Sequence, residues 1–230
     1  MTAKVLPILP ALLRRAHLAA LDRAVDHVQA CLDTPAVWAE ASALYHQPVP
    51  DADALGDLLA DRNAQPEFLS LLLWDGCPGQ PQPVGADLLH NTTDVWQRKV
   101  LQALLDTPPR CWVVIKIEAQ TVYVRGLGDR RVLRIDEPLL ASAVQPGDLW
   151  LGRIVTVQGV SMLDAVHAWL PAATLAAMKR VAPHIRALPR AKQLYGWLQV
   201  AGRTCQQLAP VAQRTRSRGN HLELVGPGMA

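Results

Sequence analysis

Hydrophobic residues recur at helical spacing near the start of the chain. Between residues 18 and 32, apolar side chains return every three or four positions, and most charged side chains fall elsewhere on the helical wheel. Thr34 and Pro35 are residue types typical of the cap and the first position of a helix, so a second helix is predicted from Pro35 to about Tyr45. A third helix is predicted to begin after Asp51.

Two more helical patterns follow before the middle of the chain. An apolar helical stretch begins at Gln65, and a Pro/Gly-rich loop from Gly76 onward ends it. Asp94, with Gln97 three residues later, resembles a capping box, and the helix that it starts is predicted to stop before Pro108. The amino-terminal region is therefore predicted to be helical.

From residue 112 the helical pattern gives way to short runs rich in β-branched residues. Pro146 and Gly147 fit the centre of a type II turn, because proline fixes φ at the first central position and glycine accepts a positive φ at the second. Gly159 marks the next tight turn. The predicted strands are residues 112–118, 121–125, 130–135, 149–157 and 160 to about 166. Five short strands with close turns are typical of a small antiparallel sheet or of an SH3-like or OB-like barrel.

Helical patterning returns beyond Pro171. Proline cannot continue a helix without losing a hydrogen bond, so breaks are predicted at Pro183 and Pro189, and Gly202 is a further candidate break. The chain then ends in a predicted loop over residues 215–220, a short alternating run and a Gly/Pro tail.

The order of these patterns predicts an α+β protein with three regions. A helical amino-terminal region (1–108) precedes a small β domain (109–170), and a basic helical region with a tail (171–230) follows. With 230 residues the chain is long enough to bury a core without a disulfide or a metal ion. Hydrophobic residues make up 50% of the chain and charged residues 19%, a composition that excludes a disordered protein.

The distribution of apolar residues and cysteines predicts a cytoplasmic protein. No apolar run approaches the roughly 18 residues that a transmembrane helix needs. Residues 5–13 are apolar, but Arg14 and Arg15 follow them, which is the reverse of a secretory signal. The four cysteines lie singly and far apart, as expected of buried thiols in a reducing compartment.

The sequence contains no complete set of metal ligands. None of the seven histidines has a second histidine one helical turn away. His27 and Cys31 have that spacing, but they offer two ligands where a zinc site needs three or four. The four aspartates between residues 51 and 61 lack the rest of a calcium-binding loop, so helix capping and a solvated face explain them. No metal site is predicted.

No catalytic centre is recognisable either. Ser161 lacks the second glycine of a nucleophile elbow, and Gly126 with Gly128 lacks the remainder of a dinucleotide-binding motif. We therefore predict a non-enzymatic protein with no catalytic residue and no cofactor. An enzyme with an active site that no motif reveals ranks third among the alternatives.

Positive charge is concentrated at the carboxy-terminal end. From Met178 onward nine basic residues stand against Glu223, giving this segment a net charge of +8 in a chain whose net charge is +3. Phosphate neutralisation by lysine and arginine supplies most non-specific affinity for nucleic acid, so this asymmetry favours DNA or RNA as a partner. The candidate nucleic-acid-binding residues are Lys179, Arg180, Arg186, Arg190, Lys192, Arg203, Arg214, Arg216 and Arg218.

Two functions therefore remain open from composition and pattern. The first is a non-enzymatic nucleic-acid-associated protein that binds mainly through phosphates, with Tyr195 and Trp197 placed either to stack on bases or in the core. The alternative is a protein-interaction or scaffold module, motivated by the helical amino-terminal half and by seven tryptophans, a residue type enriched at binding hot spots. A solvated basic face, or one that pairs with the acidic amino-terminal half, would also explain the charge asymmetry. The sequence leaves the oligomeric state open.

Two segments of the chain also resemble an uncharacterised bacterial family. Residues 68–75 read FLSLLLWD and precede a Pro/Gly loop, a helix and paired strands, and residues 144–155 read VQPGDLWLGRIV. This order of segments is similar to that in members of the family, which have a helical amino-terminal half and a small β domain. Some members also carry a SecA-like zinc tail. The resemblance covers roughly residues 60–180 and implies a fold more than an activity. The chain has no Cys/His cluster at either end, so the resemblance gives no reason to expect the zinc tail here.

Overall fold

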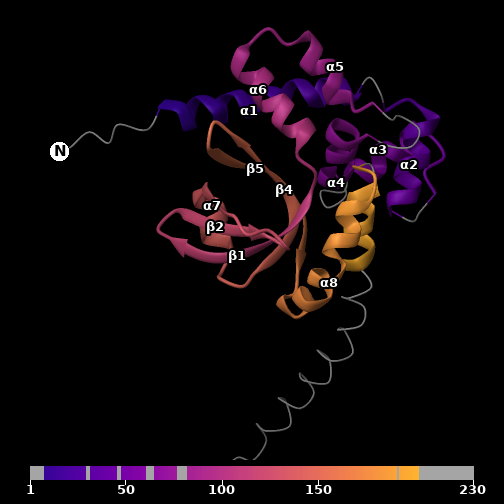
Figure 1. Cartoon of the computed structure of the whole chain (residues 1–230). Coiled ribbons are helices and arrows are strands. Elements are labelled where there is room, and N and C mark those ends of the chain that lie inside the picture. Colours follow the sequence, from indigo (N-terminus) through magenta and orange to yellow (C-terminus); the bar gives the residue numbers. More distant parts are fainter. Residues whose placement is uncertain are drawn as a thin grey trace, which may run out of the picture.

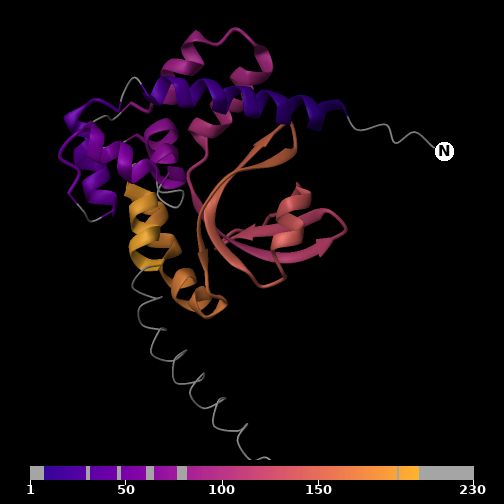
Figure 2. The ribbon, with the colours of Figure 1, turned by 180° about the vertical axis from the view of Figure 1, so that it is seen from behind.

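The computed structural model describes residues 8–29, 32–45, 48–60, 65–76, 82–190 and 192–201. Within these residues, helices pack against a closed five-stranded barrel (Figure 1), which confirms the predicted α+β class with helices on both sides of the strands in sequence. Helix α1 runs across one end of the barrel, and the carboxy-terminal helices lie beside the amino-terminal ones (Figures 1 and 2). None of the described helices combines the length and the apolarity that a membrane span requires.

Most amino-terminal helices follow the predicted pattern and its capping residues, but residues 84–91 form a helix that was not predicted, and it begins inside the predicted Pro/Gly loop. The Asp94 carboxylate accepts hydrogen bonds from the backbone N–H groups of Trp96 and Gln97 at 2.9 and 2.8 Å, which confirms the predicted cap. Asp51 accepts one from the Ala54 N–H at 2.8 Å in the same way. The elements are α1 (Ile8–Gln29), α2 (Pro35–Tyr45), α3 (Ala52–Ala60), α4 (Gln65–Ser70), the π-helix η1 (Leu71–Asp75), α5 (Val84–Asn91) and α6 (Val95–Asp106).

The five predicted strands form a barrel of the OB type. Its strands are β1 (Arg110–Glu118), β2 (Thr121–Gly126), β3 (Val132–Asp136), β4 (Leu149–Val157) and β5 (Val160–Leu170), paired in the closed order β1-β2-β3-β5-β4. Placing the fifth strand between the third and the fourth distinguishes the OB type from an SH3-like barrel. It also makes β3 and β5 parallel. The other four strand pairs are antiparallel, as predicted, so the prediction is wrong for the β3–β5 pair alone.

The turns of the barrel use the predicted residues, but the short helix between β3 and β4 was not predicted. Gly147 has a φ of +95° and Gly159 one of +80°, backbone conformations that glycine adopts without strain. Helix α7 (Pro138–Ala143) connects β3 to β4, and its Leu140 packs into the barrel core. Pro138 in its first turn is a helix-start signal, but six residues are too few to show apolar periodicity.

The carboxy-terminal region corrects one predicted helix break. After the 3₁₀ turn η2 (Ala172–Thr174), helix α8 (Leu175–Ala187) contains Pro183 in its interior, so the break predicted there is wrong. Pro183 is exposed, and the lost hydrogen bond leaves the carbonyl of the exposed Lys179 within reach of water. The break at Pro189 is confirmed, because residues 192–201 form a separate helix. Gly202, the predicted loop and the alternating run lie outside the described residues.

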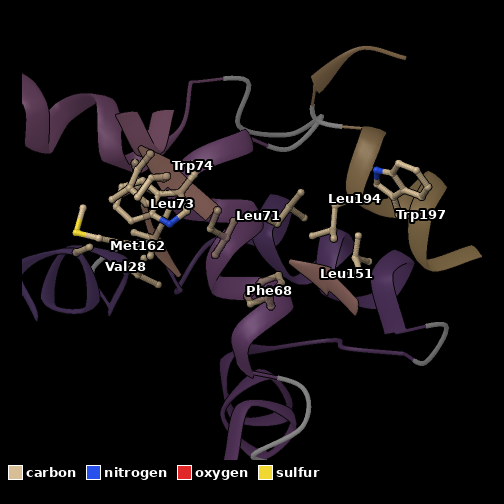
Figure 3. Close-up of a cluster of buried hydrophobic side chains, with 14 of the residues drawn as sticks. Val28, Phe68, Leu71, Leu73, Trp74, Leu151, Met162, Leu194 and Trp197 are labelled. Carbon is tan, nitrogen blue, oxygen red and sulfur yellow. The ribbon is translucent and has the colours of Figure 1, made fainter. Parts of the chain in front are cut away.

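The helical regions and one side of the barrel share a single hydrophobic core. Figure 3 shows Phe68 and Leu71 from the amino-terminal helices close to Leu151 of β4 and Leu194 of the last helix, with Trp197 of that helix to the side of Leu194. A second cluster fills the barrel, and it consists of Trp112, Val114, Val122, Val124, Ile135, Leu140, Trp150 and Ile154. Strand β4 contributes to both clusters, because it is buried on its two faces over most of its length.

Candidate functional site

The predicted basic residues of the carboxy-terminal region divide into three groups. Lys179 and Arg180 on α8, and Lys192 on the following helix, are exposed and have no ion-pair partner in the described part of the chain. Arg186 and Arg190 are partly buried in ion pairs within the protein. The remaining predictions, Arg203, Arg214, Arg216 and Arg218, lie outside the described residues.

Arg186 attaches α8 to the turn between β2 and β3. Its Nη2 lies 3.2 Å from the Asp129 carboxylate and donates a hydrogen bond to the Leu127 carbonyl. Arg110 at the start of β1 binds the other oxygen of Asp129 at 2.8 Å. Arg186 is therefore committed to holding the helix against the barrel.

Arg190 extends this attachment into the interior. Its Nε lies 3.0 Å from the Asp75 carboxylate at the end of the π-helix. Its Nη2 donates to the carbonyls of Leu104 and Thr107, at the end of α6, at 3.0 and 3.2 Å. These groups use most of the donors of the guanidinium, so Arg190 is not available for an external phosphate.

Asp75 also binds a second, fully buried arginine, Arg153 of β4. The Arg153 side chain has no solvent exposure, and its Nη2 lies 2.6 Å from Asp75 and 3.1 Å from the Ser70 hydroxyl. Its Nη1 donates to the carbonyls of Leu104 and Thr107. Its Nε lies 3.5 Å from Asp164 of β5. We call Arg153, Asp75, Asp164, Arg190 and their partners the arginine network.

Local backbone structure places these groups together. The last carbonyls of α6 have no partner within the helix and lie at the negative end of its dipole, so two guanidinium groups cap them favourably. The β4–β5 pairing shifts register on both sides of Arg153, between Leu151 and Gly152 and again between Arg153 and Ile154. Bulges of this kind change the direction in which side chains point. Here the Arg153 guanidinium points toward the helices instead of into the barrel interior.

A histidine–carboxylate pair joins α1 to this network. His17 Nε2 lies 3.1 Å from Asp164, and both side chains line a cavity of about 240 Å³ together with Ser161. These residue types are those of a hydrolytic triad. The Ser161 hydroxyl, however, is hydrogen-bonded to Thr156 at 3.0 Å, and no hydrogen bond joins it to His17 among the described side chains. The pair therefore anchors α1 to β5.

The other groups that could react or bind a metal, among the described residues, form no site either. Burial raises the pKa of the Cys111 thiol to about 12, so it is protonated and unreactive at neutral pH. No three His, Cys, Asp or Glu side chains gather as metal ligands within the described ranges. The side chains of His27 and Cys31 are not among those that the structure describes.

The strongest candidate site lies on the outer surface of the barrel, at residues that were not among the predicted binding residues. Val122 and Val124 of β2 point inward, so Tyr123 and Arg125 between and after them point outward. Tyr123 pairs across the sheet with Lys116 of β1 and Arg134 of β3. We call this surface, with the adjacent turn, the barrel face, and its residues are Lys116, Tyr123, Arg125, Arg130, Arg131 and Arg134.

The barrel face combines an aromatic ring with exposed positive charge. Lys116 Nζ lies 4.3 Å from the centre of the Tyr123 ring, and it also pairs with Glu118 at 2.6 Å. That hydrogen bond from Lys116, followed by one from Tyr123, lowers the pKa of Glu118. Arg125 and the two arginines of the β2–β3 turn are exposed, and no carboxylate lies within ion-pair distance of them in the described structure.

Asp136 connects the barrel face to α1. Burial alone would raise its pKa, but hydrogen bonds from Thr121 and Arg134, and the charges of Arg134 and Arg14, lower it. The Arg134–Asp136 pair is exposed and measures 3.0 Å. Alternation along β2 and β3, with a tyrosine and arginines at the outward positions, is the sequence signal that could have revealed this surface.

Tyr195 and Trp197, the two candidate aromatic residues of the carboxy-terminal region, make contacts within the protein. Trp197 is 1% exposed and belongs to the shared core. The Tyr195 hydroxyl donates to the Glu40 carboxylate of α2 at 2.6 Å. Of the alternatives that the sequence left for Trp197, core packing is therefore the observed one.

A comparison of the chain with models of protein families, with curated proteins and with solved structures finds no match.

The arginine network predicts a strong, non-additive effect of mutation. Asp75→Ala leaves Arg153 buried without its closest carboxylate, and we expect it to lower the free energy of unfolding by about 3–5 kcal/mol. Arg153→Met removes the charge that needs Asp75. The double variant should therefore cost about 0.5–3 kcal/mol less than the sum of the two single variants in denaturant titrations.

Lys116→Gln is the matched control, because it breaks an exposed ion pair and should leave stability nearly unchanged. Additive costs for Asp75→Ala and Arg153→Met would contradict the account of the network.

His167 of β5 predicts a pH dependence of stability. Burial, together with the charge of Arg153, lowers its pKa from 6.5 to about 4, and neither ring nitrogen has a hydrogen-bond partner among the described groups. As the pH falls, His167 therefore takes up a proton in the unfolded chain at a higher pH than in the folded protein. We expect this difference to lower the free energy of unfolding by about 3 kcal/mol between pH 6.5 and 4. His167→Leu should lose less stability over that range in denaturant titrations, and parallel pH profiles would count against this assignment.

Proposed function

We propose that the protein is a non-enzymatic, cytoplasmic, nucleic-acid-associated protein that binds mainly through phosphate contacts. The observation that carries the proposal is the barrel face, where Tyr123 lies between the exposed Lys116 and Arg134 across the sheet. The exposed Arg125, Arg130 and Arg131 follow on β2 and in its turn to β3. The two carboxylates near this face, Glu118 and Asp136, are already paired with Lys116 and Arg134. Arg125, Arg130 and Arg131 remain without an internal partner in the described structure.

The chemistry of this surface suits a polyanion with flat bases. Exposed arginines release condensed counterions when they bind phosphates, which gives affinity without sequence preference. An aromatic ring among them gives a base a surface on which to stack. Lys116 covers the Tyr123 ring, but a lysine held only by an exposed ion pair moves aside at little cost. By analogy, the same strands of OB-type barrels hold oligonucleotides, although a fold alone does not establish a function.

The carboxy-terminal cations take a smaller part in this proposal than the sequence suggested. Arg186 and Arg190 hold helices in place, as their ion pairs with Asp129 and Asp75 indicate. Lys179, Arg180 and Lys192 are free to extend the contact to more phosphates.

The protein-interaction alternative also has an observation in its favour. Trp169 of β5 is 52% exposed and contacts the buried Trp150 edge to face, with 5.6 Å between ring centres. Leu139 of α7 is 80% exposed. Tryptophan is enriched at the binding hot spots of protein interfaces. Single exposed apolar residues are, however, common on protein surfaces.

The proposal predicts a salt-dependent affinity that depends on the barrel face. If about four phosphates are held, the logarithm of the association constant should fall against the logarithm of salt concentration with a slope of roughly −3 to −4. Replacing Arg125, Arg130 and Arg131 with Gln should flatten the slope by roughly 2 to 3. Fluorescence anisotropy of a labelled oligonucleotide at several salt concentrations measures this slope.

The control variant removes the same charge from the carboxy-terminal region by replacing Lys179, Arg180 and Lys192 with Gln. It should change the slope less than the barrel-face variant does. No binding at low salt would overturn nucleic-acid binding and favour the protein-interaction alternative. If the control variant changes the slope more than the barrel-face variant does, the binding site lies on the carboxy-terminal helices instead.

A further inference from the structure

A groove of about 1060 Å³ lies between the first turns of α1 and the barrel. Arg14, Arg15 and Leu18 of α1 line one side. Gln120 in the β1–β2 turn and Pro138 of α7 line the other side. Figures 1 and 2 show the amino-terminal end of α1 extending over the side of the barrel on which the β1–β2 hairpin lies. We call this feature the α1 groove.

The α1 groove is continuous with the barrel face. Arg134 belongs to both, since it pairs with Tyr123 across the sheet and also lines the groove. Asp136 responds to the charges of Arg134 and Arg14, so α1 and β3 present their arginines to the same space. A ligand that follows the barrel face toward the β1–β2 turn therefore enters the groove.

Two arginines of the groove are free to bind an anion. Arg14 and Arg15 are exposed, and no carboxylate lies within ion-pair distance of either in the described residues. Leu18 between the groove and solvent is 62% exposed, although it belongs to a helix that is well packed on its other side. The groove, which Asp22 and the paired Asp136 also line, thus sets free guanidinium groups beside exposed apolar surface.

This combination distinguishes a single strand from a duplex. A duplex presents phosphates on its outside and keeps its base faces stacked inside, so it can use the arginines but not the apolar wall. A single strand exposes phosphates and base faces together, and it can use both. We propose that the α1 groove holds single-stranded nucleic acid, with phosphates on Arg14 and Arg15 and bases against Leu18 and Pro138. This inference rests on the proposed function and names its substrate class.

His17 explains how α1 can serve as a wall. It lies in the helical turn after Arg14, and its ring binds Asp164 of β5 at 3.1 Å while Ala16 and Ala20 are buried against the core. The helix is thereby fixed to the barrel by one side, and its other side is held open over the β1–β2 turn. A fixed wall reduces the ordering that binding would otherwise require.

The test compares a labelled oligothymidine with a blunt duplex of the same length, by fluorescence anisotropy on the full chain. We expect the single strand to bind about tenfold more tightly at moderate salt, the equivalent of about one stacked base. Replacing Arg14 and Arg15 with Gln should flatten the salt slope for the single strand by about 1.4. The control, Lys179→Gln with Arg180→Gln, removes the same charge outside the groove and should preserve the single-strand preference.

A second pair of variants tests the apolar wall without changing charge. Leu18→Ala should reduce the preference for the single strand, whereas Val95→Ala, at a position of α6 that is 60% exposed and lies outside the groove, should not. Circular dichroism checks that each variant is folded.

The outcomes separate this inference from the proposed function. Equal affinity for the two oligonucleotides, an unchanged salt slope in the Arg14/Arg15 variant, or an unchanged single-strand preference in the Leu18 variant would overturn the groove while leaving nucleic-acid binding intact. The absence of binding to either oligonucleotide would overturn both.

Discussion

The buried charge of Arg153 is the constraint around which the helices are arranged. A guanidinium without solvent exposure is costly unless its charge is compensated, and Asp75, Asp164, Ser70 and the last carbonyls of α6 provide the compensation. These groups come from the π-helix, from β5 and from the end of α6. Arg190 adds a second guanidinium from the carboxy-terminal helix to the same carboxylate. The barrel, the amino-terminal helices and the carboxy-terminal helix therefore meet at one set of charges.

The same arrangement divides the cations of the protein by their use. Arg153, Arg186 and Arg190 bind carboxylates and carbonyls of other elements, and they thereby hold these elements together. Cations of the barrel face and the α1 groove have few or no such partners. Because the Asp164–His17 pair fixes α1 against β5, the network also determines where Arg14 and Arg15 stand relative to the barrel. Stability and the proposed binding surface thus depend on one set of contacts.

Much of the fold could be predicted from local sequence signals, whereas the site could not. The alternation in β2 and the positive φ required at Gly147 identify strands and turns because both are local. Helix α7 is too short to show a period, and the tolerance of Pro183 depends on its exposure in the folded helix. Charge counting could not separate Arg190, whose partner Asp75 is 115 positions away, from free cations. The family resemblance stays a prediction, although its two segments meet in the Asp75–Arg153 pair.

The most direct test of the central claim is photocrosslinking of the full chain to a single-stranded oligonucleotide that carries 5-iodouracil, with the adducts mapped by mass spectrometry. Base stacking on the barrel face predicts a principal adduct at Tyr123 that unlabelled single strand competes away and that Tyr123→Leu removes. Adducts confined to residues 202–230, or adducts that persist unchanged in the Tyr123→Leu variant, would contradict the account and place binding elsewhere on the chain.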